Sequence, residues 1–303
     1  MNYASIIKEI GRGAKGARSM PREQAQELFG LILDGKVPDM ELGAILMALR
    51  IKGETPDELL GFLAALDERT RQVSVPAGPR CVLLPTYNGA RKQPNLMPLV
   101  ALLLAREGVP VLVQGRHDFE SRVSPFDLLA ALGIDTERSL PDAAAALADR
   151  HIACLRLDML ARGLDWLLGL RLTLGVRNSG HTLAKLLDPC RGRSVRVVAV
   201  THPPYLESMQ TLLEAKQATA LLMRGTEGEA YAAPRRRPRL LGFTQGIAEE
   251  IFAAAEFGGE EIEGESCSVA ENAALIRRML ADETPVPQPI LDQVAALKAL
   301  ACN

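Results

Sequence analysis

Apolar residues recur every three or four positions through the first 70 residues, which is the spacing of amphipathic helices. The pattern predicts three helices, over residues 21–33, 38–52 and 55–66. Gly35 supplies the left-handed residue that ends the first helix, and Thr55 opens the third with a capping box. The start of the chain is therefore predicted to form a small helical bundle.

The pattern changes after residue 80, where short apolar runs alternate with longer helical stretches. An apolar run over 81–84 ends at a polar loop, a helical stretch covers 95–106, and a second apolar run covers 109–113. This strand, helix, strand order requires a parallel pair of strands with a crossover helix. Residues 196–200 and 218–223 are predicted as further buried strands.

Two further segments complete the picture of the fold. The run over 152–157 fits either a strand or the start of a buried helix, and residues 269–281 and 289–300 have the pattern of amphipathic helices. A chain of 303 residues with 48% hydrophobic residues can bury one or two good cores. We therefore predict an α/β protein, with a small helical domain and a larger α/β domain around a central, mostly parallel sheet.

Charge narrows the classes of function. The net charge of −2 and the pI near 6.2 argue against a uniformly basic nucleic-acid-binding protein, although they leave room for a basic face. Only eight of the 35 basic residues are lysine; arginine suits bidentate phosphate contacts, and a GC-rich genome would also raise its count. The most basic window is 234–239, where four arginines among prolines predict an extended or turn segment. This segment is either an arm that contacts phosphate or an exposed basic turn.

Two basic loops leave the carboxyl ends of the first two predicted strands, where parallel sheets bind their ligands. The first loop offers a glycine for close backbone approach and leads into the amino terminus of a helix, which is a natural place for a phosphate. The candidate contacts are Asn88, Gly89, Arg91, Lys92 and Asn95 on the first loop, and Arg116 and Arg122 on the second.

Cysteine usage and hydropathy bear on the compartment. The five cysteines are odd in number and form no CxxC pair, which predicts reduced thiols. No apolar run reaches the roughly 18 residues that a membrane span needs. The first residues, 1–5, lack the charged and apolar regions of a signal peptide, so we expect a cytoplasmic protein.

The segment 40–55, MELGAILMALRIKGET, resembles the helical-domain signature of the anthranilate phosphoribosyltransferase and nucleoside phosphorylase family, glycosyltransferase family three. A second block over 171–177, followed by Asp188 and Pro189, resembles the family's Arg-x-x-Leu-Gly-x-Arg-Thr segment. The resemblance spans nearly the whole chain. It implies a helical domain of residues 1–70 completed by about 158–190, and an α/β domain of residues 75–157 and 191–303.

The same resemblance implies a homodimer through the helical domains. The apolar stripe of one helix is either core of the bundle or a face that a second copy buries. Because a bundle this small cannot bury all its apolar surface alone, we predict a twofold dimer through this domain. The stripe consists of Leu42, Ile45, Leu46 and Leu49.

The resemblance carries the activity over less well. The family's Gly-Thr-Gly-Gly-Asp diphosphate loop falls on residues 85–89, and its Lys-His-Gly-Asn-Arg block on 113–116, with few matching residues. The family's metal-binding Asp-Glu pair falls on Ala230-Tyr231, which offers no carboxylate for Mg²⁺. Glu227 and Glu229 are either a substitute metal pair or solvated loop acids. We expect no catalytic residue, no metal and no cofactor.

Three segments, over 88–95, 175–185 and 224–229, resemble the YbiB-type branch of this family. The branch is identified with a dimeric fold that has no demonstrated phosphoribosyl transfer and binds nucleic acid through a basic surface. This implies a protein that contacts phosphates without reading sequence. The alternative is a phosphoribosyltransferase or phosphorylase-type glycosyltransferase with an unknown acceptor.

Further candidate phosphate contacts lie beyond the two loops. The resemblance adds Arg171, Arg177, His181 and Lys185, and the basic window adds Arg235, Arg236 and Arg237. His181 is alternatively a satisfied, partly buried histidine, and salt bridges are an equal alternative for Arg171 and Arg177. We expect the cations of the two loops, Arg177, Lys185 and the arginines over 235–239 to form one basic track.

Overall fold

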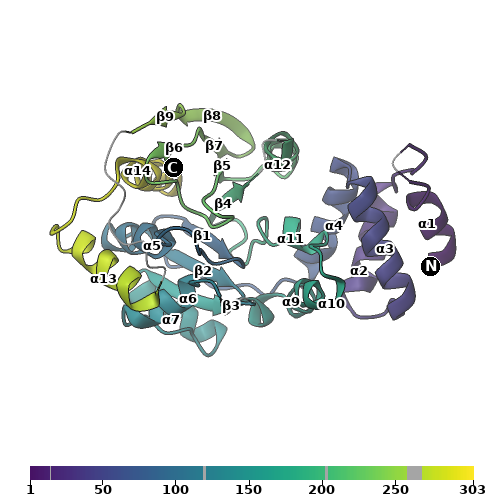
Figure 1. Cartoon of the computed structure of the whole chain (residues 1–303), viewed down its shortest axis with the longest axis horizontal. Coiled ribbons are helices and arrows are strands. Elements are labelled where there is room, and N and C mark those ends of the chain that lie inside the picture. Colours follow the sequence, from purple (N-terminus) through teal and green to yellow (C-terminus); the bar gives the residue numbers. More distant parts are fainter. Residues whose placement is uncertain (14, 119–120, 202–203, 258–267) are drawn as a thin grey trace. The chain divides into compact units, whose positions relative to one another are not determined.

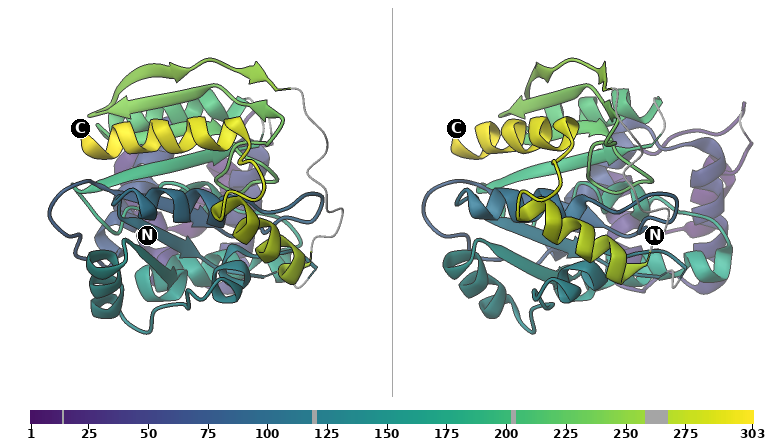
Figure 2. Two further views of the ribbon diagram at one scale, coloured as in Figure 1. Left: turned by 90° about the vertical axis from the view of Figure 1, so that its left-hand side faces the viewer. Right: turned by 60° about the vertical axis from the view of Figure 1, so that its left-hand side comes forward.

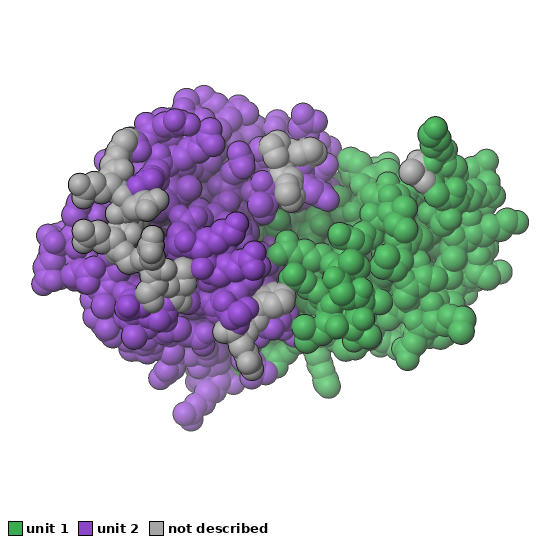
Figure 3. All heavy atoms as spheres, in the orientation of Figure 1, with its two compact units in different colours: residues 1–71, 157–189 green, residues 72–156, 190–303 purple. Residues whose placement is uncertain are grey.

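The computed structural model describes residues 1–303 except 14, 119–120, 202–203 and 258–267. The chain divides into two compact units (Figure 3). Unit 1 consists of Met1–Arg71 and Leu157–Pro189, and unit 2 of Gln72–Arg156 and Cys190–Asn303. Unit 1 is helical and unit 2 is built on a mostly parallel sheet, so the predicted fold class is confirmed. Within the described residues, no helix has both the length and the apolar character that crossing a membrane requires.

Unit 1 is a bundle in which helices from the start of the chain are joined by helices from a returning middle segment. Two of them, α2 and α4, pack through the stacked rings of Phe29 and Phe62, whose centroids lie 4.6 Å apart. The helices are α1 (Tyr3–Ile10), α2 (Arg22–Leu33), α3 (Asp39–Lys52), α4 (Pro56–Arg69), α8 (Leu157–Leu160), α9 (Arg162–Gly169), α10 (Arg171–Leu174) and α11 (Gly180–Leu183).

The predicted helix boundaries are confirmed by their caps. Gly35 has a φ of +65°, and the capping box of Thr55 and Glu58 is formed in full. The carboxylate of Glu58 is buried, accepts a hydrogen bond from the Met20 N–H and pairs with Lys52 at 2.6 Å. A capping residue thus also ties together three segments of the unit.

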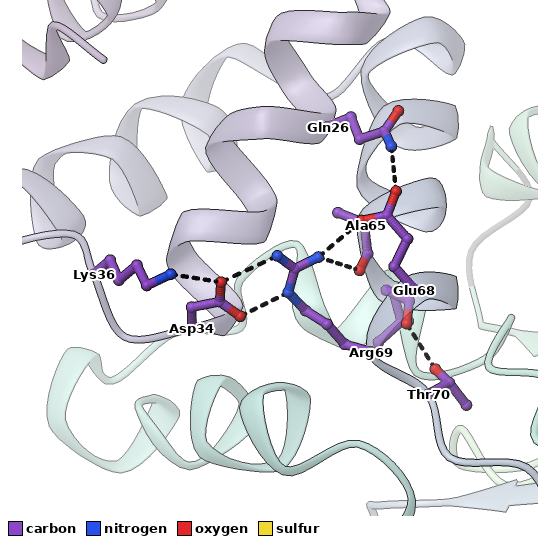
Figure 4. A network of polar contacts seen from close by, with 8 residues as sticks. Gln26, Asp34, Lys36, Ala65, Glu68, Arg69 and Thr70 are labelled. Carbon is purple, nitrogen blue, oxygen red and sulfur yellow. Dashed lines mark hydrogen bonds and ion pairs between the residues drawn. The ribbon is translucent and has the colours of Figure 1, made fainter.

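Polar contacts fix the ends of α2 and α4 to each other (Figure 4). Arg69 donates from Nε to Asp34 Oδ1 at 2.7 Å, and Lys36 donates to Asp34 Oδ2 at 3.3 Å. The hydrogen bond from Arg69 is the main cause that lowers the pKa of Asp34 to about 2. Gln26 adds a hydrogen bond to Glu68 at 2.7 Å.

The apolar stripe of Leu42, Ile45, Leu46 and Leu49 lies inside unit 1. Its four side chains are at most 4% exposed within a single chain. Of the two alternatives for the stripe, core of the bundle is therefore the correct one, and the dimer through this domain stays a prediction. The apolar side chains that α3 does expose are Met40, Met47 and Ile51.

Unit 2 contains a seven-stranded sheet in the order β3-β2-β1-β4-β5-β7-β8 (Figures 1 and 2). The first five strands in this order are parallel, and β7 and β8 add an antiparallel hairpin. The strands are β1 (Cys81–Thr86), β2 (Val111–Gly115), β3 (Ile152–Arg156), β4 (Ser194–Val200), β5 (Ala220–Arg224), β7 (Leu240–Thr244) and β8 (Ile247–Phe252), while β6 (Arg236–Arg237) and β9 (Ala255–Glu256) form a separate pair.

The strands that were predicted from the sequence are buried along all or nearly all of their length. Every residue of β1, β2 and β4 is buried, as expected for parallel strands that are covered on both faces. Residues 152–157, for which the sequence fitted either a strand or the start of a buried helix, form the strand β3 over Ile152–Arg156. The hairpin β7–β8 was not predicted, because β8 is an edge strand whose residues all lie partly or fully exposed. The helices of unit 2 are α5 (Met97–Arg106), α6 (Pro125–Ala131), α7 (Leu140–Asp149), α12 (Pro204–Ala215), α13 (Val269–Leu280) and α14 (Gln288–Cys302).

The described cysteines are all free thiols. Cys81, Cys154 and Cys190 are buried and Cys302 is exposed, while Cys267 lies outside the described residues. Burial raises the pKa of Cys154 to about 12, so this thiol is a core residue and not a nucleophile.

Candidate functional site

The candidate site lies at the carboxyl edge of the parallel strands of unit 2. Thr86 at the end of β1 pairs with Gly115 at the end of β2, and β5 ends at Arg224 on the same edge. The loops that begin at residues 87, 116 and 225 therefore leave the sheet at the same edge.

The loop after β5 is a tight turn whose geometry requires glycine. Glu227 and Gly228 have φ values of +52° and +90°, and the Glu229 N–H donates to the Thr226 carbonyl at 2.9 Å. These values are those of a type I′ turn. A Cβ atom on Gly228 would lie 2.2 Å from Nδ2 of Asn88, so the turn packs directly on the loop after β1.

Glu229 reaches from this turn into the loop after β1. Its Oε1 accepts hydrogen bonds from the N–H groups of Asn88 at 3.1 Å and Gly89 at 2.9 Å, and its side chain is wholly buried. Burial raises the pKa of this carboxyl, against the lowering effect of the Thr86 hydroxyl and of the loop N–H groups. Of the two alternatives for this residue, a solvated loop acid is therefore wrong.

Glu227 holds the second half of the same loop. Its carboxylate accepts hydrogen bonds from the Arg91 N–H at 3.2 Å and the Lys92 N–H at 2.9 Å. Two internal carboxylates thus satisfy four main-chain donors of the loop, at residues 88, 89, 91 and 92. We expected these donors to be open to a phosphate, and the structure contradicts this because the chain fills the positions itself.

Three of the loop residues proposed as contacts are buried and support the loop from inside. The Gly89 N–H bonds Glu229, and a Cβ atom there would lie 2.9 Å from the Val123 carbonyl oxygen. Asn95 accepts from the Met97 N–H at 3.2 Å and donates to the Val123 carbonyl at 3.2 Å, which ties the start of α5 to the loop after β2. Asn88 is 2% exposed beneath Gly228.

The cationic side chains at the carboxyl edge of the sheet differ in whether other residues of the protein already bind them. Arg91 and Lys92 are exposed, and neither side chain has a hydrogen bond or ion pair with another described residue. Arg116 pairs with Asp118 at 2.6 Å, and Arg122 donates to the Gly89 carbonyl at 3.3 Å.

Sequence reasoning missed a further cation at this edge. Arg224 ends β5, is exposed, and has no ion pair or hydrogen bond within the described part of the chain. Its position directly after the apolar run over 218–223 was the available signal, because the last residue of a buried parallel strand opens onto the ligand edge.

The arginine-rich segment over 234–239 begins with a turn at residues 234–235 and continues as the short strand β6, which agrees with the predicted extended or turn segment. Three of its four arginines have acidic partners. Arg237 pairs with Asp292, donates from Nε to the Ala253 carbonyl at 3.0 Å, and lies 5.0 Å from the ring centre of Phe252. Arg236 pairs with Glu256 at 3.1 Å, and Arg239 pairs with Glu250. Arg235 is exposed and has contacts of its own.

The remaining candidates belong to unit 1. The helix α10 ends at Gly175, which has a φ of +72°, so Arg177 does not continue the helix of Arg171. His181 is buried and its Nδ1 accepts from the Asn178 N–H at 3.3 Å. Burial and the charge of Arg177 lower the pKa of Lys185 to about 8. These residues lie in unit 1 and the loop residues lie in unit 2, so a basic track that includes both stays a prediction.

The positions that resemble the family's metal pair have a structural role here. Ala230 and Tyr231 are buried, and the Tyr231 hydroxyl donates to the Pro94 carbonyl at 3.0 Å. The amide of Gln293 bonds the main chain on both sides, to Ala230 and Ala232. In the described ranges no three His, Cys, Asp or Glu side chains cluster as a metal site would require.

Comparison with known proteins agrees with this architecture. A family model described as the glycosyl transferase family helical bundle domain matches residues 4–70, and one for the family's a/b domain matches residues 89–302. Among relatives, the chain is 38% identical to the uncharacterized protein YbiB of Escherichia coli (strain K12), over 97% of this chain and 93% of that protein. It is 28% identical to an anthranilate phosphoribosyltransferase of Thermus thermophilus, over 91% of this chain and 83% of that protein.

Solved structures give the same result. The crystal structure of anthranilate phosphoribosyltransferase from Thermus thermophilus superposes with a TM-score of 0.75 at 27% identity, covering 98% of this chain and 88% of that chain. The Saccharomyces cerevisiae enzyme in complex with PRPP and Mg shares the fold, with a TM-score of 0.73 at 16% identity over 99% of this chain and 88% of that chain. The chain therefore belongs to glycosyl transferase family three, with the family's helical bundle domain followed by its α/β domain.

Proposed function

We propose that this protein binds nucleic acid through phosphate contacts at the carboxyl edge of its sheet, without reading sequence. One observation carries the proposal: Glu227 and Glu229 occupy the main-chain donors of the loop after β1, while Arg91 and Lys92 project free cations from the same loop. A small diphosphate needs those donors, whereas a polymer needs only exposed charge along its backbone.

The arrangement fixes the cations without neutralising them. The carboxylate of Glu227 binds the main chain of Arg91 and Lys92 and leaves their side chains available. A loop held in this way loses less conformational entropy when its side chains contact phosphates. Arg224 adds a third free cation at the same edge.

Two features of the proposed assembly follow from the same function. We propose a homodimer, which would present the cationic edge twice, because two weak sites on one polymer gain from effective concentration. The exposed apolar side chains of α3, Met40, Met47 and Ile51, are the surface proposed for it. The free buried thiols support a cytoplasmic protein, where cysteines stay reduced.

A phosphoribosyl or phosphorylase-type transfer is the second candidate, and the anthranilate phosphoribosyltransferases at 28–30% identity favour it. That chemistry expels diphosphate and draws on a metal ion to stabilise the leaving charge. The residues here fit such an ion poorly, because Ala230 and Tyr231 carry no carboxylate and Glu227 and Glu229 already accept loop N–H groups. Transfer would require the two glutamates to release the loop.

A pair of binding measurements separates the two candidates. Gel shifts with single- and double-stranded DNA and RNA at increasing salt are expected to show binding to every sequence, with log affinity falling linearly against log salt. Calorimetry with phosphoribosyl diphosphate and Mg²⁺ is expected to show no binding in the micromolar range. Micromolar, Mg²⁺-dependent binding together with the absence of a gel shift would establish the transferase instead.

A further inference from the structure

Unit 2 contains a pocket of about 340 Å³ beside the carboxyl edge of the sheet. It is lined by the helix α12, the end of β5, the strand β7 and the arginine-rich segment over 236–239. Arg224 and Gly225 belong to both the pocket and the loop edge, so the pocket opens next to the proposed phosphate contacts. Its size is at the lower end of the range for pockets that hold small molecules.

The floor of the pocket is apolar. Leu222 of β5 and Leu241 of β7 are directly opposite each other in the antiparallel ladder, and both line the pocket. Leu206 of α12 and Ala254 add further apolar surface. A floor of this kind favours an occupant with a flat or compact apolar body.

The rim is cationic and held in place. The guanidinium of Arg237 is fixed by Asp292, by the Ala253 carbonyl and by the rings of Phe252 and Phe257, at 5.0 and 5.4 Å. Arg236 and Arg239 have exposed acidic partners, which an anionic ligand can displace at small cost.

Arg224 is the exception on this rim. Its side chain has no hydrogen bond or ion pair with another described residue, so the lining carries one positive charge that the described residues do not compensate. An occupant that brings one negative group and an apolar body would satisfy both parts of the pocket.

We infer that this pocket binds one nucleotide unit, with the base over Leu222 and Leu241 and the phosphate at Arg224. The inference rests on the proposed function, since it names the part of the polymer that the pocket would take. A base is planar and apolar on its faces, so one face can pack on the leucine floor while its polar edges meet the cationic rim. The same chemistry would accept a free nucleoside monophosphate.

Calorimetry with nucleoside 5′-monophosphates tests the pocket directly. AMP or UMP is expected to bind measurably, whereas inorganic phosphate and ribose 5-phosphate, which lack the base, are expected to bind at least tenfold more weakly. Arg224→Ala is expected to weaken AMP binding by about tenfold or more, because a hydrogen-bonded charge pair is lost. Equal affinity for AMP and ribose 5-phosphate would overturn the inference.

A filling variant with a matched control locates the ligand. Ala254→Trp places a large side chain in the pocket from an exposed position and is expected to abolish AMP binding. Ala215→Trp, at an exposed position at the end of α12 that does not line the pocket, is expected to leave AMP binding unchanged. Full AMP affinity in Ala254→Trp would overturn the inference. An oligonucleotide that ends in the pocket is expected to lose affinity in the same variant.

The inference and the proposed function fail in different ways. If gel shifts detect polymer binding but no mononucleotide binds the wild-type protein, the pocket inference is overturned and the phosphate-contact function stands. If neither the polymer nor AMP binds, both are overturned. Loss of AMP binding in Ala254→Trp, with polymer binding weakened but still detectable through the exposed cations of the loop, would support both.

Discussion

Two basic segments of unit 2 use their acidic partners in opposite ways. In the loop over 88–92, Glu227 and Glu229 bind main-chain N–H groups and leave the cationic side chains free. In the segment over 236–239, the acids bind the guanidinium groups themselves. Two segments that both look basic in sequence therefore differ in the structure: the loop over 88–92 exposes free cations, whereas the arginines over 236–239 are largely neutralised by acidic side chains.

A count of basic residues in the sequence does not show which cations already have an acidic partner. A cationic side chain contributes most to binding a polyanion when no acidic side chain of the protein already pairs with it. A buried ion pair is costly to break, so its cation stays with its acidic partner. Arg237 and Asp292 are 15% and 10% exposed, whereas Arg91 and Lys92 lie in solvent. The ion pairs of the segment over 236–239 are therefore expected to stabilise the fold and the pocket wall, whereas the loop supplies uncompensated charge for binding a polyanion.

The largest expected effect is on the buried pair of the arginine-rich segment. Arg237→Met leaves Asp292 without its charge partner in a largely buried position, and we expect it to lower the free energy of unfolding by about 3–5 kcal/mol. Denaturant unfolding measures this. Arg237→Met with Asp292→Leu is expected to recover much of the loss, and a single variant as stable as the wild type would contradict the structural role.

The next effect concerns the carboxylate beneath the loop. Glu229→Ala leaves the N–H groups of Asn88 and Gly89 buried without an acceptor, which is expected to cost about 2–4 kcal/mol in unfolding free energy. Glu229→Gln retains an acceptor oxygen and is the matched control, with an expected cost of at most about 1 kcal/mol. Equal stability of the two variants would show that the hydrogen bonds are dispensable.

A smaller effect is the pH dependence that Glu229 confers. Its pKa is raised by burial above its ordinary value of 4.5, so the folded state favours the protonated form. The stability from this group is therefore full below pH 4.5 and is lost as pH rises through the raised pKa. Urea unfolding at about pH 5 and about pH 8 is expected to show a larger loss for the wild type than for Glu229→Gln, and identical pH profiles would refute this.

The sequence predicted local features well because their signals are local. Gly35 and the capping box at Thr55 end and begin helices by contacts within four residues, and the apolar runs of β1 and β4 follow from burial on both faces. The basic loop after β1 was predicted at the correct edge of the sheet, since the order of strand, loop and helix determines that position.

The features that were not predicted from the sequence depend on contacts between residues far apart in the chain. Glu227 and Glu229 bond N–H groups that lie 135 to 141 positions earlier in the chain, so no local pattern shows that the loop is filled from within. The acidic partners of the segment over 236–239 come from β8, β9 and α14, and they are likewise invisible to a count of nearby charges.

Removing the free cations of the loop after β1 tests most directly whether nucleic acid binds at this edge of the sheet. Arg91→Ala with Lys92→Ala is expected to weaken binding to every nucleic-acid sequence by roughly 10- to 30-fold at about 0.15 M salt, and to flatten the slope of log affinity against log salt by about one to two units. The control is Arg106→Ala with Lys298→Ala, which removes the same charge from exposed positions at the opposite edge of the sheet. It is expected to change neither affinity nor slope. Unchanged affinity and slope in the loop variant, with the fold intact by circular dichroism, would contradict the placement of nucleic acid on this edge.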